Sequence, residues 1–206
     1  MKKKISIFIT ALLLSVALYH SLYFEKLDVK KERESTKDFN PVEKVDYFWK
    51  YELDDRFESA LDLKYFDSQL TDHPESLMRQ HGKSVGITST FCFLVKGTAI
   101  MNEQDADELP VEIANSNAEY SLQIKYIFGN TARDALGFFD IADFENTMDF
   151  NAVAREVNRR IRENEISKLD SLSPGSRIMF VGAVALNSER IPDEMDIVPL
   201  KIKAVQ

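Results

Sequence analysis

The sequence predicts an α+β fold, with an N-terminal helical subdomain at residues 39–85 and a small β-barrel domain at residues 86–206. Apolar residues recur with helical spacing in the first part, whereas the second part contains runs with the period of two that strands require. The order in the second part is three strands, one helix and two strands. That order is typical of a five-stranded OB-like antiparallel barrel, and a simple meander with a packed helix is the alternative.

The first 24 residues have the pattern of a targeting segment. Three lysines precede an apolar run of 20 residues from Ile5, with His20 and a few hydroxyl groups as its polar content. A run of this length can span a bilayer, and the lysines before it favour a cytoplasmic N-terminus. The stretch VALYHSLYF is a poor cleavage site, and no cysteine follows the run as a lipoprotein signal requires. We therefore expect residues 1–24 to form an uncleaved signal anchor, a transmembrane segment.

Charge limits both the location and the partners of the remaining chain. Residues 25–38 are highly charged and predict a juxtamembrane linker, so that a single-pass membrane protein carries its domain on the periplasmic, extracytoplasmic side. The whole chain has a net charge of −8, and outside the first 24 residues 23 basic residues oppose 34 acidic ones, or −11. A domain this acidic repels phosphate backbones, which argues against nucleic acid as a partner.

Cysteine and histidine are scarce in this chain. Cys92 is the one cysteine, so neither an intramolecular disulfide nor a cysteine metal cluster can be built. His73 and His81 are the histidines beyond the N-terminal segment, and no third ligand is spaced to join them. We therefore expect no metal site, no cofactor and no catalytic triad.

The helical subdomain opens with a clear start signal. Asn40 is placed to cap a helix, and Pro41 suits the first helical position. The apolar stripe of this helix consists of Val42, Val45, Phe48, Trp49 and Leu53. We expect Trp49 on the buried face, packed with Phe48 or Leu53, so that Trp49→Ala would cost about 3–5 kcal/mol.

Five runs predict the strands of the barrel. They cover residues 90–101, 109–114, 119–128, 177–186 and 196–205. Gly97 and Gly182 fall inside two of them, where a barrel bends sharply or two backbones approach closely. Between the third and fourth runs, residues 151–170 carry one apolar stripe and a face of arginines and glutamates, which predicts an amphipathic helix.

The segment GNTARDALGFFDIADF, residues 129–144, joins the third strand to this helix. Thr131 is placed to cap a short helical turn, and Gly137 can end the turn with a positive φ. The apolar side chains of the segment, which we expect to plug the open end of the barrel, are Phe138, Phe139, Ile141 and Phe144. Arg133 and Asp134 form either a local ion pair or a polar pair over a groove. The candidate binding residues are Arg133, Asp134, Asp140, Asp143 and, in the first strand, Lys96.

Three stretches together resemble a known family. They are FLVKGTAI, GNTARDALGFFDIADFENTMDFNAVAREVN and the pair FVGAVAL and DIVPLKI. They are similar to the predicted periplasmic lipoproteins called domain of unknown function 2291, from about Phe39 to the C-terminus. The resemblance implies a helical subdomain before an OB-like barrel, export from the cytoplasm and, for some members, association with sugar ABC transport. This chain departs from the family's label because it lacks the lipidation cysteine.

These observations favour a non-enzymatic binding or accessory protein of unknown ligand, tethered outside the cytoplasmic membrane. Its expected partners are the membrane itself and a sugar ABC transporter component or another envelope protein. The alternative is a carboxylate-based envelope hydrolase, because acidic residues cluster at positions 103–108 and recur at Asp140, Asp143, Glu145 and Asp149. Glycoside hydrolysis would require two carboxyl groups roughly 5–10 Å apart in a cleft. A calcium site at residues 140–145 lacks the glycine and the ligand spacing of an EF-hand loop.

Overall fold

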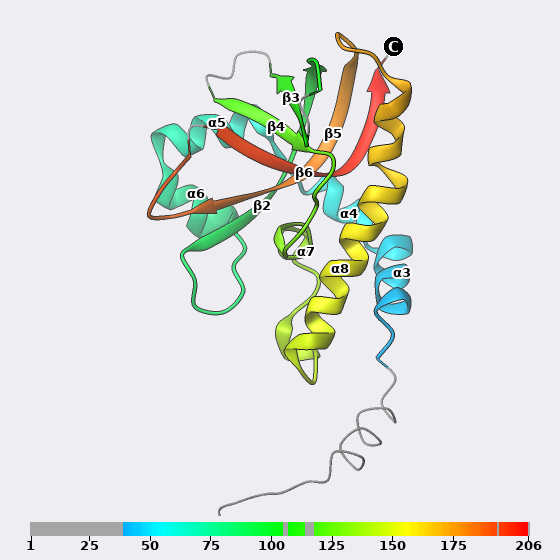
Figure 1. Cartoon of the computed structure of the whole chain (residues 1–206). Helices are drawn as coiled ribbons and strands as arrows, with labels where there is room; N and C mark the ends of the chain where they lie inside the picture. The colour runs from blue at the N-terminus through cyan, green and yellow to red at the C-terminus, as the bar shows by residue number, and fades with distance from the viewer. Residues whose placement is uncertain (1–38, 105–106, 114–117, 193, 206) are drawn as a thin grey trace, which may run out of the picture. The chain divides into compact units, whose positions relative to one another are not determined.

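The computed structural model describes residues 39–205 except 105–106, 114–117 and 193 (Figure 1). Residues 40–206 form one compact unit. The predicted anchor and linker, residues 1–24 and 25–38, lie outside the described residues. In the part of the chain that is described, no helix is both long enough and apolar enough to cross a membrane.

A closed five-stranded barrel forms the centre of this unit, as the sequence predicted. Its strands are β2 (Thr90–Met101), β3 (Glu108–Glu112), β4 (Glu119–Gln123), β5 (Arg177–Asn187) and β6 (Glu194–Val205). The order around the barrel is β2-β3-β4-β6-β5, and β2 closes it by pairing with β5. The fully antiparallel arrangement that we expected is wrong at one place, because β4 and β6 pair in parallel. Since β5 runs antiparallel to both β2 and β6, closure leaves β6 parallel to β4.

The third strand is shorter than the sequence predicts. The run at residues 119–128 keeps its period of two to the end, yet β4 stops at Gln123, which pairs with the first residue of β3, Glu108. Beyond this pair Ile124 N–H still donates to the carbonyl oxygen of Asp107 at 3.3 Å, and among the described residues the next positions join no strand. Tyr126 and Phe128 are exposed and stack on each other with ring centroids 5.9 Å apart.

Gly182 marks a bend of the barrel, as expected. The register between β5 and β6 shifts between Val181 and Gly182, which is a bulge. A Cβ atom at Gly182 would collide with the side chain of Ile197 and lie 3.0 Å from the carbonyl oxygen of Val198. A side chain at this position would therefore force Ile197 to move and would crowd the backbone of Val198.

The helices before the barrel are α3 (Pro41–Tyr51), α4 (Leu53–Glu58), α5 (Leu63–Asp72) and α6 (Pro74–His81), with the short strand β1 (Leu61–Asp62) beside β2. Asn40 caps α3, since its Oδ1 accepts the N–H groups of Val42 at 3.1 Å and Glu43 at 3.3 Å. The expectation that Trp49 is buried is wrong, since Phe48 is buried and Trp49 is half-buried, whereas the expected contact of Trp49 with Phe48 is confirmed, with ring centroids 6.0 Å apart. These helices pack on the barrel and on α8 (Thr147–Asn164), and their independence as a subdomain stays a prediction.

Apolar side chains from α5 and α6 share one core with the inward-facing residues of the strands. Phe66 of α5 meets Phe93 of β2 edge to face, with ring centroids 5.2 Å apart. The aromatic plug expected from residues 138–144 is therefore wrong. Phe138 and Phe139 pack on Phe48 of α3 instead, because the barrel interior is already filled from the other helices.

A second apolar layer lies outside the barrel wall. The short helix α7 (Thr131–Leu136) contacts β2 and β5, and α8 contacts α3 and α7. The buried residues of α7 include Ala132, Ala135 and Leu136. Gly137 ends α7 with φ 59°, as the sequence predicted, whereas the capping position belongs to Asn130 and its side chain makes no cap bond. Two 3₁₀ turns, η1 (Ile141–Asp143) and η2 (Ile166–Ser171), flank α8.

Candidate functional site

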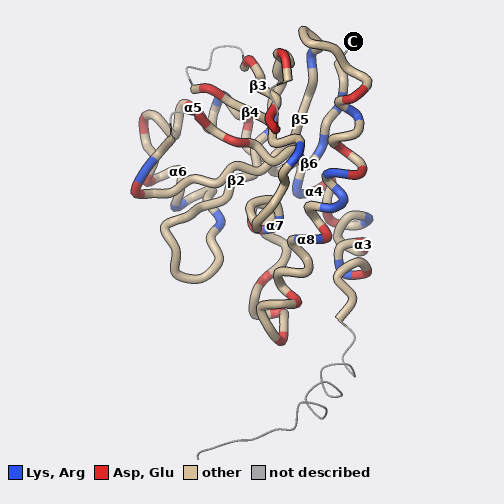
Figure 2. Tube along the Cα trace, in the orientation of Figure 1, with Lys and Arg blue, Asp and Glu red and all other residues tan. Residues whose placement is uncertain are grey.

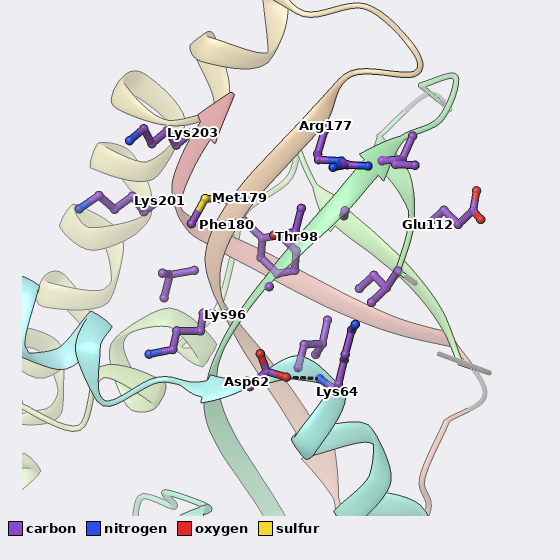
Figure 3. A pocket seen from close by; sticks show the side chains of 16 residues that line it. Asp62, Lys64, Lys96, Thr98, Glu112, Arg177, Met179, Phe180, Lys201 and Lys203 are labelled. Atoms are coloured by element: carbon purple, nitrogen blue, oxygen red, sulfur yellow. Dashed lines mark hydrogen bonds between the residues drawn. The ribbon is translucent and has the colours of Figure 1, made fainter. Parts of the chain in front are cut away.

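A groove of about 770 Å³ lies on the outward face of β2, β5 and β6 (Figure 3). Side chains alternate across a strand, so every second residue of each strand points outward here. The register places three cross-strand rows on this face: Lys96–Val181–Lys201, Thr98–Met179–Lys203 and Ile100–Arg177–Val205. The volume falls in the range of about 300–1,000 Å³ that is usual for small-molecule sites.

The groove exists because one edge of β2 is partly unpaired. On that edge β2 pairs with β1 at Val95 and Lys96, and with β3 at Ile100 and Met101. Among the described residues, the three positions between these pairs have no strand partner on that edge. The opening is bordered by the start of α5 on one side and by the end of β3 on the other.

Positive charge dominates the groove. Five basic side chains line it, Lys64, Lys96, Arg177, Lys201 and Lys203, against the two acidic side chains Asp62 and Glu112. This excess of three positive charges stands in a chain whose net charge is −8. The groove is therefore a local basic region on an acidic protein, and it attracts anions.

Three of these cations are uncommitted. Within the described part of the chain, Lys64, Arg177 and Lys203 make no side-chain ion pair or hydrogen bond. Lys96, by contrast, donates from Nζ to the carbonyl oxygen of Glu58 at 2.8 Å. Lys201 Nζ lies 3.5 Å from a carboxylate oxygen of Asp54, which is itself largely exposed. In Figure 3, Lys96, Lys201 and Lys203 extend to the same side of the groove.

The acids of the groove do not neutralise this charge. Asp62 caps α5, where its Oδ1 accepts the N–H of Lys64 at 2.9 Å and that of Tyr65 at 3.4 Å. Glu112 lies at the far edge, where β3 ends. The floor between the charges is apolar, and Met179 and Ile100 remain 51% and 37% exposed.

The opposite outward face of the barrel is acidic. Outward positions of β3, β4 and the first half of β6 carry Glu108, Glu119, Glu194 and Asp196. Red segments recur along β3 and β4 in Figure 2. OB-folds bind oligonucleotides over the second and third barrel strands, which are β3 and β4 here. Carboxylates on the described parts of those strands would repel phosphates.

Arg133 and Asp134 lie at a second, smaller cavity of about 280 Å³, between α7 and the start of α8. The Arg133 side chain is 2% exposed, and its Nε donates to Asp134 Oδ1 at 2.8 Å. Its Nη1 donates to the carbonyl oxygen of Phe150 at 2.9 Å, and the guanidinium carbon lies 3.4 Å from the centre of the Phe150 ring. The predicted ion pair is confirmed, and its contacts tie α7 to α8.

Burial shapes the ionisation of the groups around this cavity. Burial raises the pKa of the Asp134 carboxyl above its ordinary value, while the hydrogen bond from Arg133 acts in the opposite direction. Burial also raises the pKa of the Cys92 thiol to about 12 and lowers the pKa of Lys83. Since Arg133 is fully engaged by the protein, this cavity has the character of a structural joint.

The structure does not gather the five candidate binding residues in one place. Arg133 and Asp134 share the smaller cavity, and Lys96 lies in the groove. Asp140 caps η1 by accepting the N–H of Ala142 at 2.9 Å, and Asp143 is exposed. Their role in binding stays a prediction.

Sequence reasoning missed the groove cations that come from separate segments. A signal was present in β6, where Lys201 and Lys203 lie on the outward face and the apolar residue between them faces the core. The sequence holds no signal that joins them to Arg177 or Lys64, because strand register and the placement of α5 bring those side chains together.

Among the described residues, the acids that the sequence offered for a hydrolase line neither cavity. Asp149 accepts a hydrogen bond from the Asn146 amide at 2.9 Å at the start of α8. Among the described residues, no group of three or more His, Cys, Asp or Glu side chains is arranged to hold a metal ion.

Comparison with known proteins identifies the family. The family model described as predicted periplasmic lipoprotein (DUF2291) matches residues 12–203. The chain belongs to this family. The resemblance seen in the sequence is thereby confirmed. The function of the family is unknown, so membership of DUF2291 assigns no activity to this protein.

The barrel has a structural relative. The crystal structure of an OB-fold protein from Thermotoga maritima MSB8 superposes with a TM-score of 0.72 at 24% identity. The match covers 82% of this chain and 100% of that protein. At this identity the likeness shows the fold, which is an OB-fold barrel. No curated protein gives a significant match to this DUF2291 chain.

Proposed function

We propose that this DUF2291 protein is a non-catalytic binding or accessory module, held at the extracytoplasmic face of the cell membrane. The groove on β2, β5 and β6 is its ligand site. One observation carries the proposal: five basic side chains line a groove in an acidic protein, and three of them lack a partner among the described residues. Basic side chains without protein partners in a concave site are a recurrent basis of anion recognition.

The tether in this proposal is the apolar segment at residues 1–24. A lipid would require a cysteine near that segment, but the one cysteine of the chain is Cys92, which is buried in β2. We propose that the segment stays uncleaved as a single-pass anchor, followed by the linker at residues 25–38. A family described as periplasmic lipoproteins supports the compartment, and the anchor replaces the lipid.

Mass spectrometry of the mature protein, together with alkaline extraction of membranes, tests the tether. We expect an intact N-terminus and retention in the extracted membrane pellet. A mature chain beginning near Tyr23 that washes off the membrane would overturn the anchor without touching the ligand site.

The accessory role extends to a partner, which we propose to be a component of a sugar ABC transporter. Affinity capture from cross-linked membranes, followed by mass spectrometry, tests it. The groove variant Arg177→Glu/Lys203→Glu should lose this partner if the groove is its site, whereas Lys50→Glu on α3 should keep it. Capture that is equal for all three proteins would show that the groove is not the partner's site.

The second candidate is a carboxylate-based envelope hydrolase. The observation in its favour is that Asp62 and Glu112 line the same groove. This candidate would be favoured if the wild-type protein hydrolyses an anionic glycan and the Glu112→Gln variant does not. Asp62 already accepts two backbone hydrogen bonds as a helix cap, which makes the binding role the better supported one.

A further inference from the structure

The groove combines two surfaces that select different parts of a ligand. Its rim is cationic, and its floor along β5 is apolar. Met179 and Val181 point outward from β5, with Lys96 on the neighbouring strand β2 on one side and Lys201 and Lys203 on β6 on the other. Neighbouring strands are about 4.8 Å apart, so the apolar strip along β5 is about one strand wide, and Lys96, Lys201 and Lys203 extend to one side of it (Figure 3).

From this arrangement we infer that the groove binds a small organic anion with an apolar body, such as a medium-chain carboxylate. The inference rests on the proposed binding function and names its ligand class. The acid group pairs with the uncommitted cation Lys203, and the apolar body covers Met179, which lies beside it in the same cross-strand row.

The floor argues against the other classes of anion. Inorganic phosphate would leave the exposed Met179 and Ile100 side chains in water, and so would gain nothing from the floor. Neutral sugars are usually held by exposed aromatic rings together with hydrogen-bonding groups. The one aromatic side chain of the groove, Phe180, is only 3% exposed and offers no ring face. A phospholipid with two acyl chains is larger than a strip one strand wide.

The size of the groove agrees with a small ligand. A cavity of about 770 Å³ is large enough for a medium-chain acid together with the water that its head group keeps. Charge steers the acid toward this face, because the opposite face over β3 and β4 carries carboxylates.

Calorimetric titration of the full-length protein in phosphatidylcholine nanodiscs tests the inference, with empty nanodiscs as the blank for partitioning. The probes are decanoate, butanoate, inorganic phosphate and decyltrimethylammonium. We expect decanoate to bind at least roughly tenfold more tightly than the other three, since each lacks either the apolar body or the negative charge.

Two variants and one control assign the binding to the groove. Lys203→Gln should weaken decanoate binding roughly tenfold, the scale of one charge-assisted hydrogen bond. Met179→Ser should weaken decanoate but leave butanoate unchanged, since it removes apolar contact alone. Lys50→Gln, an exposed lysine outside the groove, should bind as wild type does. Equal melting temperatures of the four proteins show that folding is intact.

The outcomes separate the inference from the function on which it rests. If phosphate binds as tightly as decanoate, or decyltrimethylammonium does, the ligand class is wrong while the groove remains a binding site. If phosphatidylglycerol added to the nanodiscs displaces decanoate, the occupant is a membrane lipid and the inference is overturned. If no probe binds and the groove variant also keeps its partner, both the inference and the proposed site fail.

Discussion

The groove and the smaller cavity both lie along one outward face of strand β2. The two halves of this face differ in whether a helix covers the charged side chains beside them. Cys92 lies under α7 beside the buried Arg133, whereas Thr98, on the same face, lies open in the groove. Over the covered half of β2, the side chain of Arg133 on α7 forms its hydrogen bonds within the protein. Beside the open half, Arg177 on β5 and Lys203 on β6 lack protein partners among the described residues. Cover by a helix thus separates a structural cation from a cation available to a ligand.

The largest expected effect belongs to the covered half. Arg133→Ala should lower the free energy of unfolding by about 3–5 kcal/mol, because it leaves the Asp134 carboxylate and the Phe150 carbonyl without their donor. Urea unfolding at pH 7 measures this. The matched change in the open half, Arg177→Ala, should stay within about 0.5 kcal/mol of wild type. Equal losses in the two variants would break the comparison.

Glu156 on α8 provides an intermediate case, since it is buried but pairs with Arg159 and Arg160, and Arg159 is partly exposed. The hydrogen bond from Arg159 is the largest cause that lowers the pKa of Glu156 below its usual 4.5, and burial opposes it. A lowered folded pKa contributes stability above the unfolded pKa that is lost as the pH falls through the folded pKa. Glu156→Gln should therefore cost about 1 kcal/mol at pH 7.

The difference between wild type and Glu156→Gln should shrink as the pH falls below about 4.5. Unfolding curves at intervals from pH 7 to pH 3 measure this trend. A difference that stays constant across the range would show that packing, and not the charge of Glu156, is responsible.

Thiol reactivity sharpens the comparison within β2 itself. Cys92 is 5% exposed and burial raises its pKa to about 12, so at pH 8 the thiolate that alkylating agents attack is scarce and covered. We expect no alkylation of native Cys92 by iodoacetamide within an hour, and rapid labelling at the open position in Thr98→Cys. Mass spectrometry reads both sites in one protein. Rapid labelling of Cys92 would mean that α7 opens readily.

The smallest stability effect is expected at Lys203, whose side chain is exposed and unpaired among the described residues. Lys203→Gln should change the free energy of unfolding by less than about 0.5 kcal/mol. A larger loss, seen in the same urea titration, would assign this lysine to the fold and weaken the case for a ligand.

The barrel was predictable because each strand has a recognisable pattern within its own stretch of sequence. Period-two runs gave all five strands, and Gly182 marked the bend where β5 approaches β6. The helix cap at Asn40 was also readable, since its partners lie two and three residues away.

Errors arose wherever a distant segment decided the outcome. Trp49 follows the helical stripe of α3, yet the guanidinium of Arg160, far along the chain, lies 5.6 Å from its ring and Phe48 takes the buried position. The groove likewise joins α5, β2, β5 and β6, and no local pattern connects Lys64 with Lys203. Charge alternation in β6 was the one trace of it that the sequence showed.

The pairing that closes the barrel also sets an order of events during synthesis. Thr90 pairs with Asn187 and Ile100 with Arg177, so partners are separated by 97 residues at one end of the ladder and by 77 at the other. At about 5–20 residues per second, β2 waits several seconds on the ribosome before β5 exists. Such long-range pairing also slows folding, since the chain loses conformational entropy on closing the loop before the contacts between β2 and β5 can form. A nascent chain cut short before residue 177 therefore leaves the β5-facing edge of β2 unpaired, and an unpaired strand edge is prone to aggregation.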